Sequence, residues 1–315
     1  MDKYKYVCCV GSVHALLLFF LINVDASVAN TVFFLPKNGG IQEIISKKML
    51  YVYWISRGGL WRRICNYYRM KYLFYKMNIN SIDRYGFDEG GWTEYMVHTT
   101  KSFNLIEDGM NNYIMLKSTK DKYQNSIIHR ILLHTPFMHI PYGLSKNISS
   151  IYFTGIDKIP QEIQDKARIV DMELLWRQCV DQRKQNILDL FGVNPDVLDL
   201  KDRSVLIITQ PLSEDNIMAE SDKIEVYKKV IKQYGERNVL IKPHPREKTN
   251  YEKKFPNALV LKSYFPIELL ALSGQNLGIR KVITVYSTAI ALFKNYEQCV
   301  LGDNAHPNLS FLKSK

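Results

Sequence analysis

The chain has 315 residues, of which 46% are hydrophobic and 23% are charged. This composition excludes a disordered or low-complexity protein, and the length suits two domains of about 100–200 residues each. The net charge of +11 favours anionic partners, whether acidic substrates, acidic membrane surfaces or nucleic acid. The five cysteines include no CxxC pair, so we expect a reducing compartment and no structural metal.

The N-terminal segment begins with basic residues and continues as an apolar stretch to Val24. It could be a signal sequence or an anchor, but Gly11, Ser12 and His14 interrupt it. We therefore favour the opening of a doubly wound α/β domain, with a turn at Gly11. Its predicted strand, helix and second strand cover residues 6–10, 13–21 and 31–35.

Aromatic and basic side chains alternate through residues 51–76, and no acidic residue interrupts them. The pattern predicts one or two helices around Gly58 and Gly59. Helices of this composition can lie on anionic membranes or bind sugars or nucleic acid. The alternative, which we favour, is a helix with a packed aromatic face and a solvated basic face.

The rest of the chain alternates strands and helices. We predict strands over residues 102–106, 150–154, 204–208, 238–242, 259–261 and 281–285, and helices over 174–191, 223–234, 267–272 and 289–293. Two such series predict an α/β fold with two Rossmann-like domains facing a cleft. The expected domains are residues 1–170 and 171–315, the second beginning with a connecting helix.

The most distinctive motif follows the strand over residues 238–242. His244 lies between two prolines, with Lys242 and Arg246 close in sequence, and the prolines hold it on a stiff loop. A histidine flanked by cations can hydrogen-bond a phosphate or protonate it as it leaves. The alternative is a histidine that only caps a turn. Pro243, Pro245 and the two cations favour the functional interpretation over this alternative.

Two further motifs in this half could contact a nucleotide. Ser287 and Thr288 lie between a strand and a predicted helix, where hydroxyls and free N–H groups form an anion site. Glu268, at the start of a short helix, could accept hydrogen bonds from ribose hydroxyls. It could equally be a favourable charge at a helix N-terminus.

Two acidic pairs are candidates for a general base. Glu107 and Asp108 precede Gly109 at the end of a strand, and Glu214 and Asp215 follow a strand of the second domain. Ordinary acidic turns would look the same. The sequence has no DxD pair and no cluster with metal spacing, which favours metal-independent chemistry.

Taken in order, three motifs resemble those of bacterial sialyltransferases. They are Glu107-Asp108-Gly109, His244-Pro245 and Ser287-Thr288. The chain looks most like glycosyltransferase family 52, the lipooligosaccharide and capsule sialyltransferases. The likeness extends from the turn at Gly11 to Ser287, and the motifs are specific only in combination.

The resemblance implies a GT-B architecture with CMP-sialic acid as donor, an N-terminal acceptor-side domain and a C-terminal CMP-sugar domain. His244 would match the general acid on the leaving phosphate. Ser287, with Thr288, would match the phosphate contact, and Glu268 the residue on the cytidine ribose.

The resemblance leaves the general base open. Related families place it at Asp108, whereas family 52 members place it in the Pro-containing turn of the second domain, nearest here to Glu214 or Asp215. The expected reaction transfers sialic acid to a terminal galactose of lipooligosaccharide, lipopolysaccharide or capsule, with inversion and without a metal or cofactor.

Two alternatives stay open: a GT-B enzyme that uses another nucleotide sugar or elongates a polysialyl capsule, and a basic binding protein that contacts RNA or membrane through residues 51–76. No nucleic-acid-binding signature supports the second. We expect no nucleic-acid partner and leave homodimerisation open. The expected location is the cytoplasm, with peripheral contact to the inner face of an anionic cytoplasmic membrane.

Overall fold

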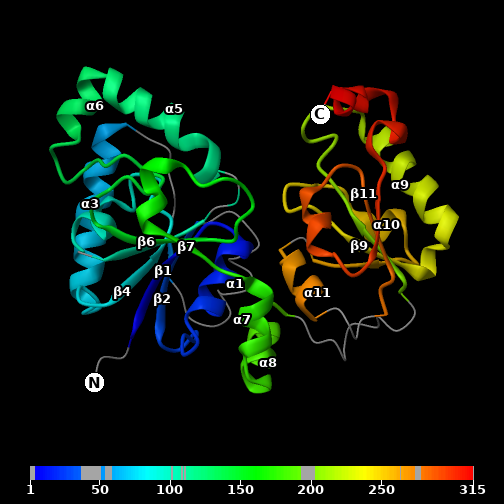
Figure 1. Cartoon of the computed structure of the whole chain (residues 1–315), viewed down its shortest axis with the longest axis horizontal. Coiled ribbons are helices and arrows are strands. Elements are labelled where there is room, and N and C mark those ends of the chain that lie inside the picture. The colour runs from blue at the N-terminus through cyan, green and yellow to red at the C-terminus, as the bar shows by residue number, and fades with distance from the viewer. Residues whose placement is uncertain are drawn as a thin grey trace. The chain divides into compact units, whose positions relative to one another are not determined.

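The computed structural model describes residues 4–36, 51–53, 59–100, 102–107, 109, 111–192, 203–262, 264–273 and 278–314. The side chains of residues 36, 51–53, 288, 313 and 314 are outside this description. The chain forms two compact units, Met1–Ile187 (unit 1) and Leu188–Lys315 (unit 2). Each unit contains one parallel sheet with helices around it (Figure 1).

Unit 1 is built on a seven-stranded sheet in the order β3-β2-β1-β4-β5-β6-β7. All its pairings are parallel. The strands are β1 (Tyr6–Cys9), β2 (Thr31–Pro36), β3 (Tyr51–Tyr53), β4 (Asp83–Gly86), β5 (Phe103–Ile106), β6 (Ile148–Phe153) and β7 (Ala167–Ile169). Because the order runs outward from β1 on both sides, the winding reverses between β1 and β4, where ligands of such sheets bind.

Helices connect or follow these strands. They are α1 (Val13–Ile22), α3 (Leu60–Lys76), α4 (Glu94–His98), α5 (Asn111–Asn125), α6 (Ile127–Leu132), α7 (Met172–Gln178) and α8 (Asp181–Leu190), with a 3-10 turn η1 (Gln161–Lys166). The predicted opening of the domain is confirmed, because Ser12 caps α1 by accepting a hydrogen bond from Ala15 N at 3.2 Å. Every side chain of α1 from Ala15 to Leu21 is buried.

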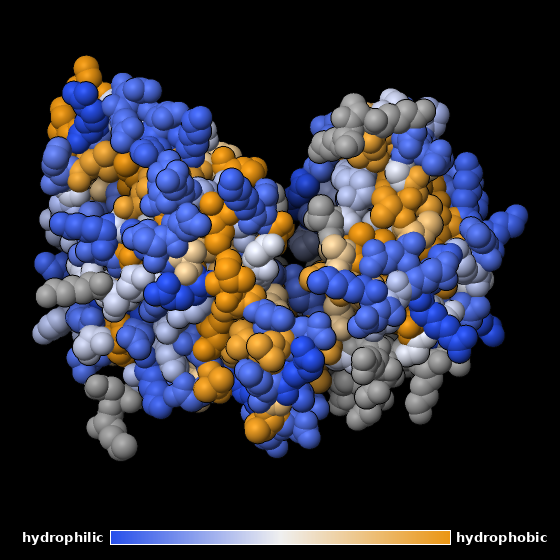
Figure 2. Space-filling model, viewed as in Figure 1, coloured by the Kyte–Doolittle hydropathy of each residue, from blue (hydrophilic) through white to orange (hydrophobic). Residues whose placement is uncertain are grey.

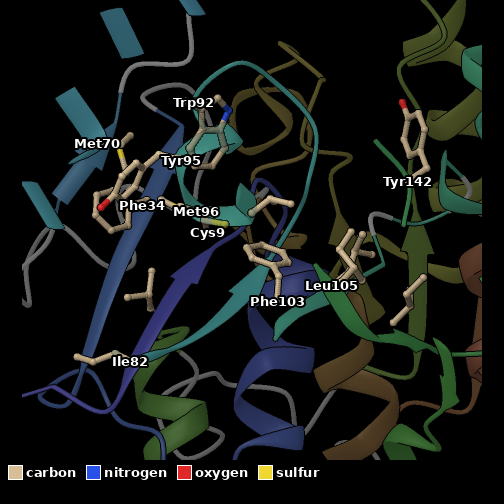
Figure 3. Packing of buried hydrophobic residues seen from close by; sticks show 14 of the residues in the cluster. Cys9, Phe34, Met70, Ile82, Trp92, Tyr95, Met96, Phe103, Leu105 and Tyr142 are labelled. Atoms are coloured by element: carbon tan, nitrogen blue, oxygen red, sulfur yellow. The ribbon is translucent and has the colours of Figure 1, made fainter. Parts of the chain in front are cut away.

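The core of unit 1 lies between the sheet and helices α3 and α4. Figure 3 shows Phe34 of β2 beside Met70 of α3, and Phe103 and Leu105 of β5 within the same cluster. Gly86 is required at the centre of the sheet, since its φ is +144° and a Cβ there would lie 2.0 Å from the carbonyl oxygen of the neighbouring strand.

Unit 2 has a five-stranded parallel sheet in the order β10-β9-β8-β11-β12. Its strands are β8 (Val205–Ile208), β9 (Val239–Lys242), β10 (Leu259–Val260), β11 (Lys281–Thr284) and β12 (Glu297–Val300). Its helical segments are α9 (Glu220–Tyr234), η2 (Glu236–Asn238), α10 (Tyr251–Lys254), α11 (Ile267–Ser273), η4 (Thr288–Leu292), η5 (Gly302–Ala305) and η6 (Pro307–Ser314). The winding of this sheet reverses between β8 and β11.

The predicted fold class is therefore confirmed: the chain is α/β, with two Rossmann-like domains of the kind that make up GT-B enzymes. Some local predictions were wrong. Residues 51–76 contain the edge strand β3 before helix α3, and the single helix over 174–191 is broken between α7 and α8. The division between the units follows Ile187 rather than residue 170, because α7 packs on α1.

Hydropathy adds one observation about these helices. Across the described ranges, none of them combines the length and the apolar character needed to cross a bilayer.

Candidate functional site

The loop over residues 243–247 leaves β9 at the carboxyl edge of the unit 2 sheet. Glu247 fixes its conformation, and the side chain of Glu247 is fully buried. The carboxylate accepts hydrogen bonds from His244 N at 2.7 Å, from Tyr251 Oη at 2.6 Å and from Thr209 Oγ1. The loop is thus tied to the end of β8 and to α10 through one satisfied buried charge.

His244 is half-buried between Pro243 and Pro245. Its Nδ1 accepts a hydrogen bond from Arg246 N at 3.1 Å, so we assign the ring proton to Nε2. Burial lowers the pKa of His244, and the charges of Arg246 and Lys242 lower it further. The imidazole is therefore neutral near pH 7, with an Nε2–H that can donate to an anion, and a bound anion would favour its protonation.

Lys242 was predicted, with His244 and Arg246, to belong to a donor-binding site, and it is only 4% exposed. The ammonium donates a hydrogen bond to Pro243 O at 2.6 Å. Burial lowers the pKa of Lys242 to about 8, against the attraction of Glu268 and Glu247. In this structure Lys242 contributes positive potential behind the loop and not an exposed contact.

Lys223 of α9 is a residue that the sequence analysis missed. Its fully buried ammonium lies 3.0 Å from Glu214, 2.9 Å from Glu220 and 3.7 Å from Glu247. One cation thereby joins the turn after β8 to the loop after β9. The signal was available, because Lys223 lies on the buried stripe of α9. The other members of this stripe are Val226, Tyr227, Val230 and Ile231.

Both acidic candidates of unit 2 have partners within the chain. Glu214 binds Lys223 and accepts a hydrogen bond from Lys248 N at 2.7 Å. Burial opposes its charge, but these two contacts outweigh burial and lower the pKa of Glu214 to about 2. Such a carboxylate is a weak base. Asp215 forms a two-pronged ion pair with Arg246, with one contact at 3.0 Å.

The end of β11 lies at the same edge, since β8, β9 and β11 are paired in parallel. Gln210 accepts a hydrogen bond from Tyr286 N at 2.7 Å and so joins the ends of β8 and β11. Ser287 Oγ accepts from Ala289 N at 3.3 Å, which leaves its O–H able to donate. The predicted helix after Thr288 is only a short 3-10 turn, so the expected helix dipole is weak there.

Glu268 lies in the first turn of α11, as predicted. Its charge is close enough to Lys242 to affect the pKa of that ammonium. The structure thus places Lys242, His244, Arg246, Glu268 and Ser287 in unit 2, around the carboxyl ends of its central strands. The side chain of Thr288 is outside the described part of the chain.

The acidic motif of unit 1 has a different environment. Glu107 follows β5 and is fully buried, accepting hydrogen bonds from Tyr113 Oη at 2.7 Å and Thr154 N at 3.0 Å. Its Oε1 lies 3.2 Å from His14 Nε2. Burial opposes its charge, but these contacts and the one from Thr154 Oγ1 lower the pKa of Glu107. Asp108 falls outside the described residues.

The two glycines named as candidates have structural explanations. Gly109 has a φ of +57°, in the left-handed region that favours glycine. A Cβ on Gly11 would lie 3.1 Å from the ring of Phe87. Gly11 therefore allows β1 to turn into α1 against a packed aromatic side chain.

A second polar cluster lies near the end of β4. The ligand atoms of Glu94, His98 and His139 lie within 4.8 Å of one another, a spacing that could suit a metal ion. The hydrogen bonds favour a different interpretation, because both nitrogens of His139 face acceptors, Glu94 and the Asp88 carbonyl. Burial opposes the charge of His139, but the nearby carboxylates of Glu94 and Asp88 raise its pKa. We therefore infer that His139 is an imidazolium that holds the backbone at Asp88.

Comparison with known proteins now identifies the family. Residues 63–309 match the model of glycosyltransferase family 52, and this region is most of the chain. The chain belongs to glycosyltransferase family 52. The resemblance inferred from the three motifs is thereby confirmed.

One relative is a protein of Haemophilus influenzae described as uncharacterized, which is 35% identical over 209 residues. The match covers 66% of this chain and 64% of that protein, so the chain spans under two thirds of its relative's length.

The solved structures to which the chain is similar include UDP-GlcNAc 2-epimerases and a glycosyltransferase. The enzyme from Methanocaldococcus jannaschii is 12% identical with a TM-score of 0.49, over 99% of this chain and 92% of that one. The Neisseria meningitidis enzyme bound to UDP-GlcNAc is 12% identical with a TM-score of 0.43, over 97% and 85%. A Rickettsia africae glycosyltransferase is 10% identical with a TM-score of 0.36, over 93% and 77%. Likeness at this level bears on neither substrate nor activity.

Proposed function

We propose that this family 52 glycosyltransferase is a sialyltransferase, which transfers sialic acid from CMP-sialic acid to a terminal galactose of a cell-surface glycan. The observation that carries the proposal is the loop after β9. It presents the Nε2–H of His244 on a fixed backbone, beside Arg246, at the edge where α/β sheets bind ligands.

The proposed reaction is a single displacement with inversion. The bond between the anomeric carbon of sialic acid and the CMP phosphate breaks as a bond to the acceptor hydroxyl forms. His244, once protonated beside the phosphate, gives its proton to the leaving phosphate oxygen. The acceptor hydroxyl loses its proton to a carboxylate. Acid and base would each contribute about 10²–10⁴-fold.

The other roles follow from what each side chain offers. Ser287 can donate its hydroxyl proton to the phosphate, and Arg246 can bind a donor carboxylate or phosphate when it exchanges its partner Asp215. Release of Asp215 by that exchange would make it available as a base. Glu214 is less suited to that role because its pKa is about 2. Asp108 remains the alternative base.

The surroundings of the loop favour an anionic donor in general, so a second candidate function is transfer from another nucleotide sugar. Two arguments support it. The proposed phosphate contacts are not specific for cytidine, and Glu268 could accept hydrogen bonds from any ribose. The same loop would then protonate a different leaving group.

The test is incubation of the purified chain with CMP-sialic acid and labelled lactose, followed by linkage analysis of the product. Stabilisation against thermal unfolding by CMP, but not by UDP or GDP, is the matched binding measurement. Transfer of sialic acid with CMP-selective stabilisation supports the proposal. Stabilisation by UDP or GDP alone, without transfer, would favour the second candidate.

A further inference from the structure

Helix α3 has a buried face and, opposite to it, an aromatic face that is open to solvent. Met70 is fully buried, whereas Trp61, Tyr68, Tyr72 and Tyr75 are 80%, 55%, 59% and 79% exposed. Successive residues rotate by about 100° around a helix, so these four side chains share one narrow stripe opposite Met70. Packing among the described residues of unit 1 leaves these four side chains exposed.

Cations border the stripe on both sides. Arg62, Arg69 and Lys76 flank one side and Lys71 the other, and all four side chains are exposed. Helix α3 contains no acidic residue, and Lys76 Nζ lies 6.0 Å from the centroid of the Tyr72 ring. Aromatic rings with basic neighbours are characteristic of helices that lie at the boundary between headgroups and acyl chains.

A second exposed apolar group lies nearby on α6, a helix with no buried residue. Its exposed side chains are Ile127, Ile128 and Ile131, at 69%, 69% and 63%. Hydrophobic atoms gather over α6 in Figure 2. The ring of Phe137, shortly after α6, lies 5.2 Å from that of Tyr67 and 6.1 Å from that of Tyr68 in α3. The two helices therefore belong to one region of unit 1.

We propose that α3 and α6 form a docking surface, here called the α3–α6 surface, that binds unit 1 peripherally to an anionic lipid bilayer. The aromatic stripe and the isoleucines enter the headgroup boundary, and the bordering cations contact anionic headgroups. The net charge of +11 adds long-range attraction to such a membrane.

The chemistry of the surface favours lipid over nucleic acid. Aromatic stacking and cations also bind single-stranded nucleic acid, but that recognition depends on aromatic and basic side chains rather than on exposed aliphatic ones. The exposed isoleucines of α6 have an obvious partner only in acyl chains or another apolar surface. Binding to lipid also needs neither donor nor acceptor sugar, so it can be measured apart from the proposed transfer reaction.

The test is sedimentation of the full chain with vesicles of phosphatidylcholine, with and without phosphatidylglycerol. Two variants probe the apolar contacts, Trp61→Ser with Tyr72→Ser on α3 and Ile127→Ser with Ile128→Ser on α6. A third, Lys71→Gln with Lys76→Gln, probes the charges and serves if an apolar variant fails to fold. Matched controls are Ile169→Ser with Val180→Ser, also exposed in unit 1, and Lys229→Gln with Lys232→Gln on α9.

Wild type should sediment with the anionic vesicles and much less with phosphatidylcholine alone. Each test variant should lower the partition coefficient by about tenfold, with an unchanged melting temperature, and the controls should leave it unchanged. Equal losses in the controls, or no sedimentation at low salt, would overturn the proposal. So would RNA binding that is steeply salt-dependent and occurs without vesicle binding. Transfer to soluble lactose, measured without vesicles, separates this result from the proposed function.

Discussion

The carboxyl edges of the two sheets share a topology but differ in what they present. In both units the winding reverses beside the first strand, and a buried carboxylate follows another strand of the sheet, Glu107 after β5 in unit 1 and Glu247 after β9 in unit 2. Glu107 binds groups that are themselves structural, such as Tyr113. Glu247 instead holds the backbone of His244, whose ring is half-buried on the fixed loop.

The comparison shows that a strand-end carboxylate does not by itself mark a catalytic site. Buried acids with satisfied partners fix loops, and the chemistry depends on the half-exposed groups that those loops carry. In unit 2 we propose that these groups are His244 and Ser287, together with the exposed Arg246. The four predictions below test this distinction, beginning with the largest expected effect.

Replacement of His244 by alanine should lower the rate of CMP release from CMP-sialic acid by about 10²–10⁴-fold, because the leaving phosphate loses its acid. His306 offers a matched control, since it also precedes a proline and its Nδ1 also accepts from the backbone N–H two residues later, at 3.2 Å. His306→Ala should leave the rate unchanged. Full activity in His244→Ala would remove the unit 2 loop from the mechanism.

Glu247→Ala and Glu107→Ala should each lower the free energy of unfolding by about 3–5 kcal/mol, since each removes a buried charge from its partners. Denaturant unfolding measures this loss. The two variants should then differ, with stabilisation by CMP lost in Glu247→Ala and kept in Glu107→Ala. If CMP stabilised both variants equally, Glu247 would have no part in fixing the binding loop.

Arg246→Gln should change the pH dependence of kcat/KM. Burial and Arg246 hold the pKa of His244 below 6.5. Activity that needs the imidazolium therefore falls as the pH rises through this lowered pKa. Removal of the charge raises the pKa, and the falling limb should move to higher pH. Lys248→Gln, which removes a charge nearby, should not move it. An unmoved limb in Arg246→Gln would assign the titration to another group.

The smallest effect concerns the polar cluster of unit 1, where Glu94, Asp88 and His98 face His139. The pKa of His139 is raised, so its stabilisation is complete below about 6.5 and disappears as the pH rises through the folded value. His139→Gln should cost about 1–2 kcal/mol of unfolding free energy at low pH and less at high pH.

Unfolding in urea across pH measures this dependence. His98→Gln is the control, because burial and His139 lower the pKa of His98, so His98 destabilises the fold on acidification. Its replacement should therefore show the opposite trend with pH. A cost for His139→Gln that did not vary with pH would show that His139 is not the imidazolium inferred here.

Much of the fold was predictable, because hydrophobic periodicity records which face of each element is buried. The strands from Tyr6 and Val205 were found in this way. The edge strand β3 was not, since a short strand inside a basic–aromatic segment has no clear period. The motifs around His244 and Ser287 were found because prolines and hydroxyls at strand ends are local signals.

By itself the sequence determined the α/β class, the family and the stiff loop around His244. These depend on local geometry and on residues close in the chain. Only the tertiary structure decided which charges are buried and with whom: Lys242 behind its loop, Lys223 among three acids, and Glu107 sealed by its hydrogen bonds. Burial and ion pairing join residues far apart in sequence, and desolvation, which sets their pKa values, exists only once the chain has folded around them.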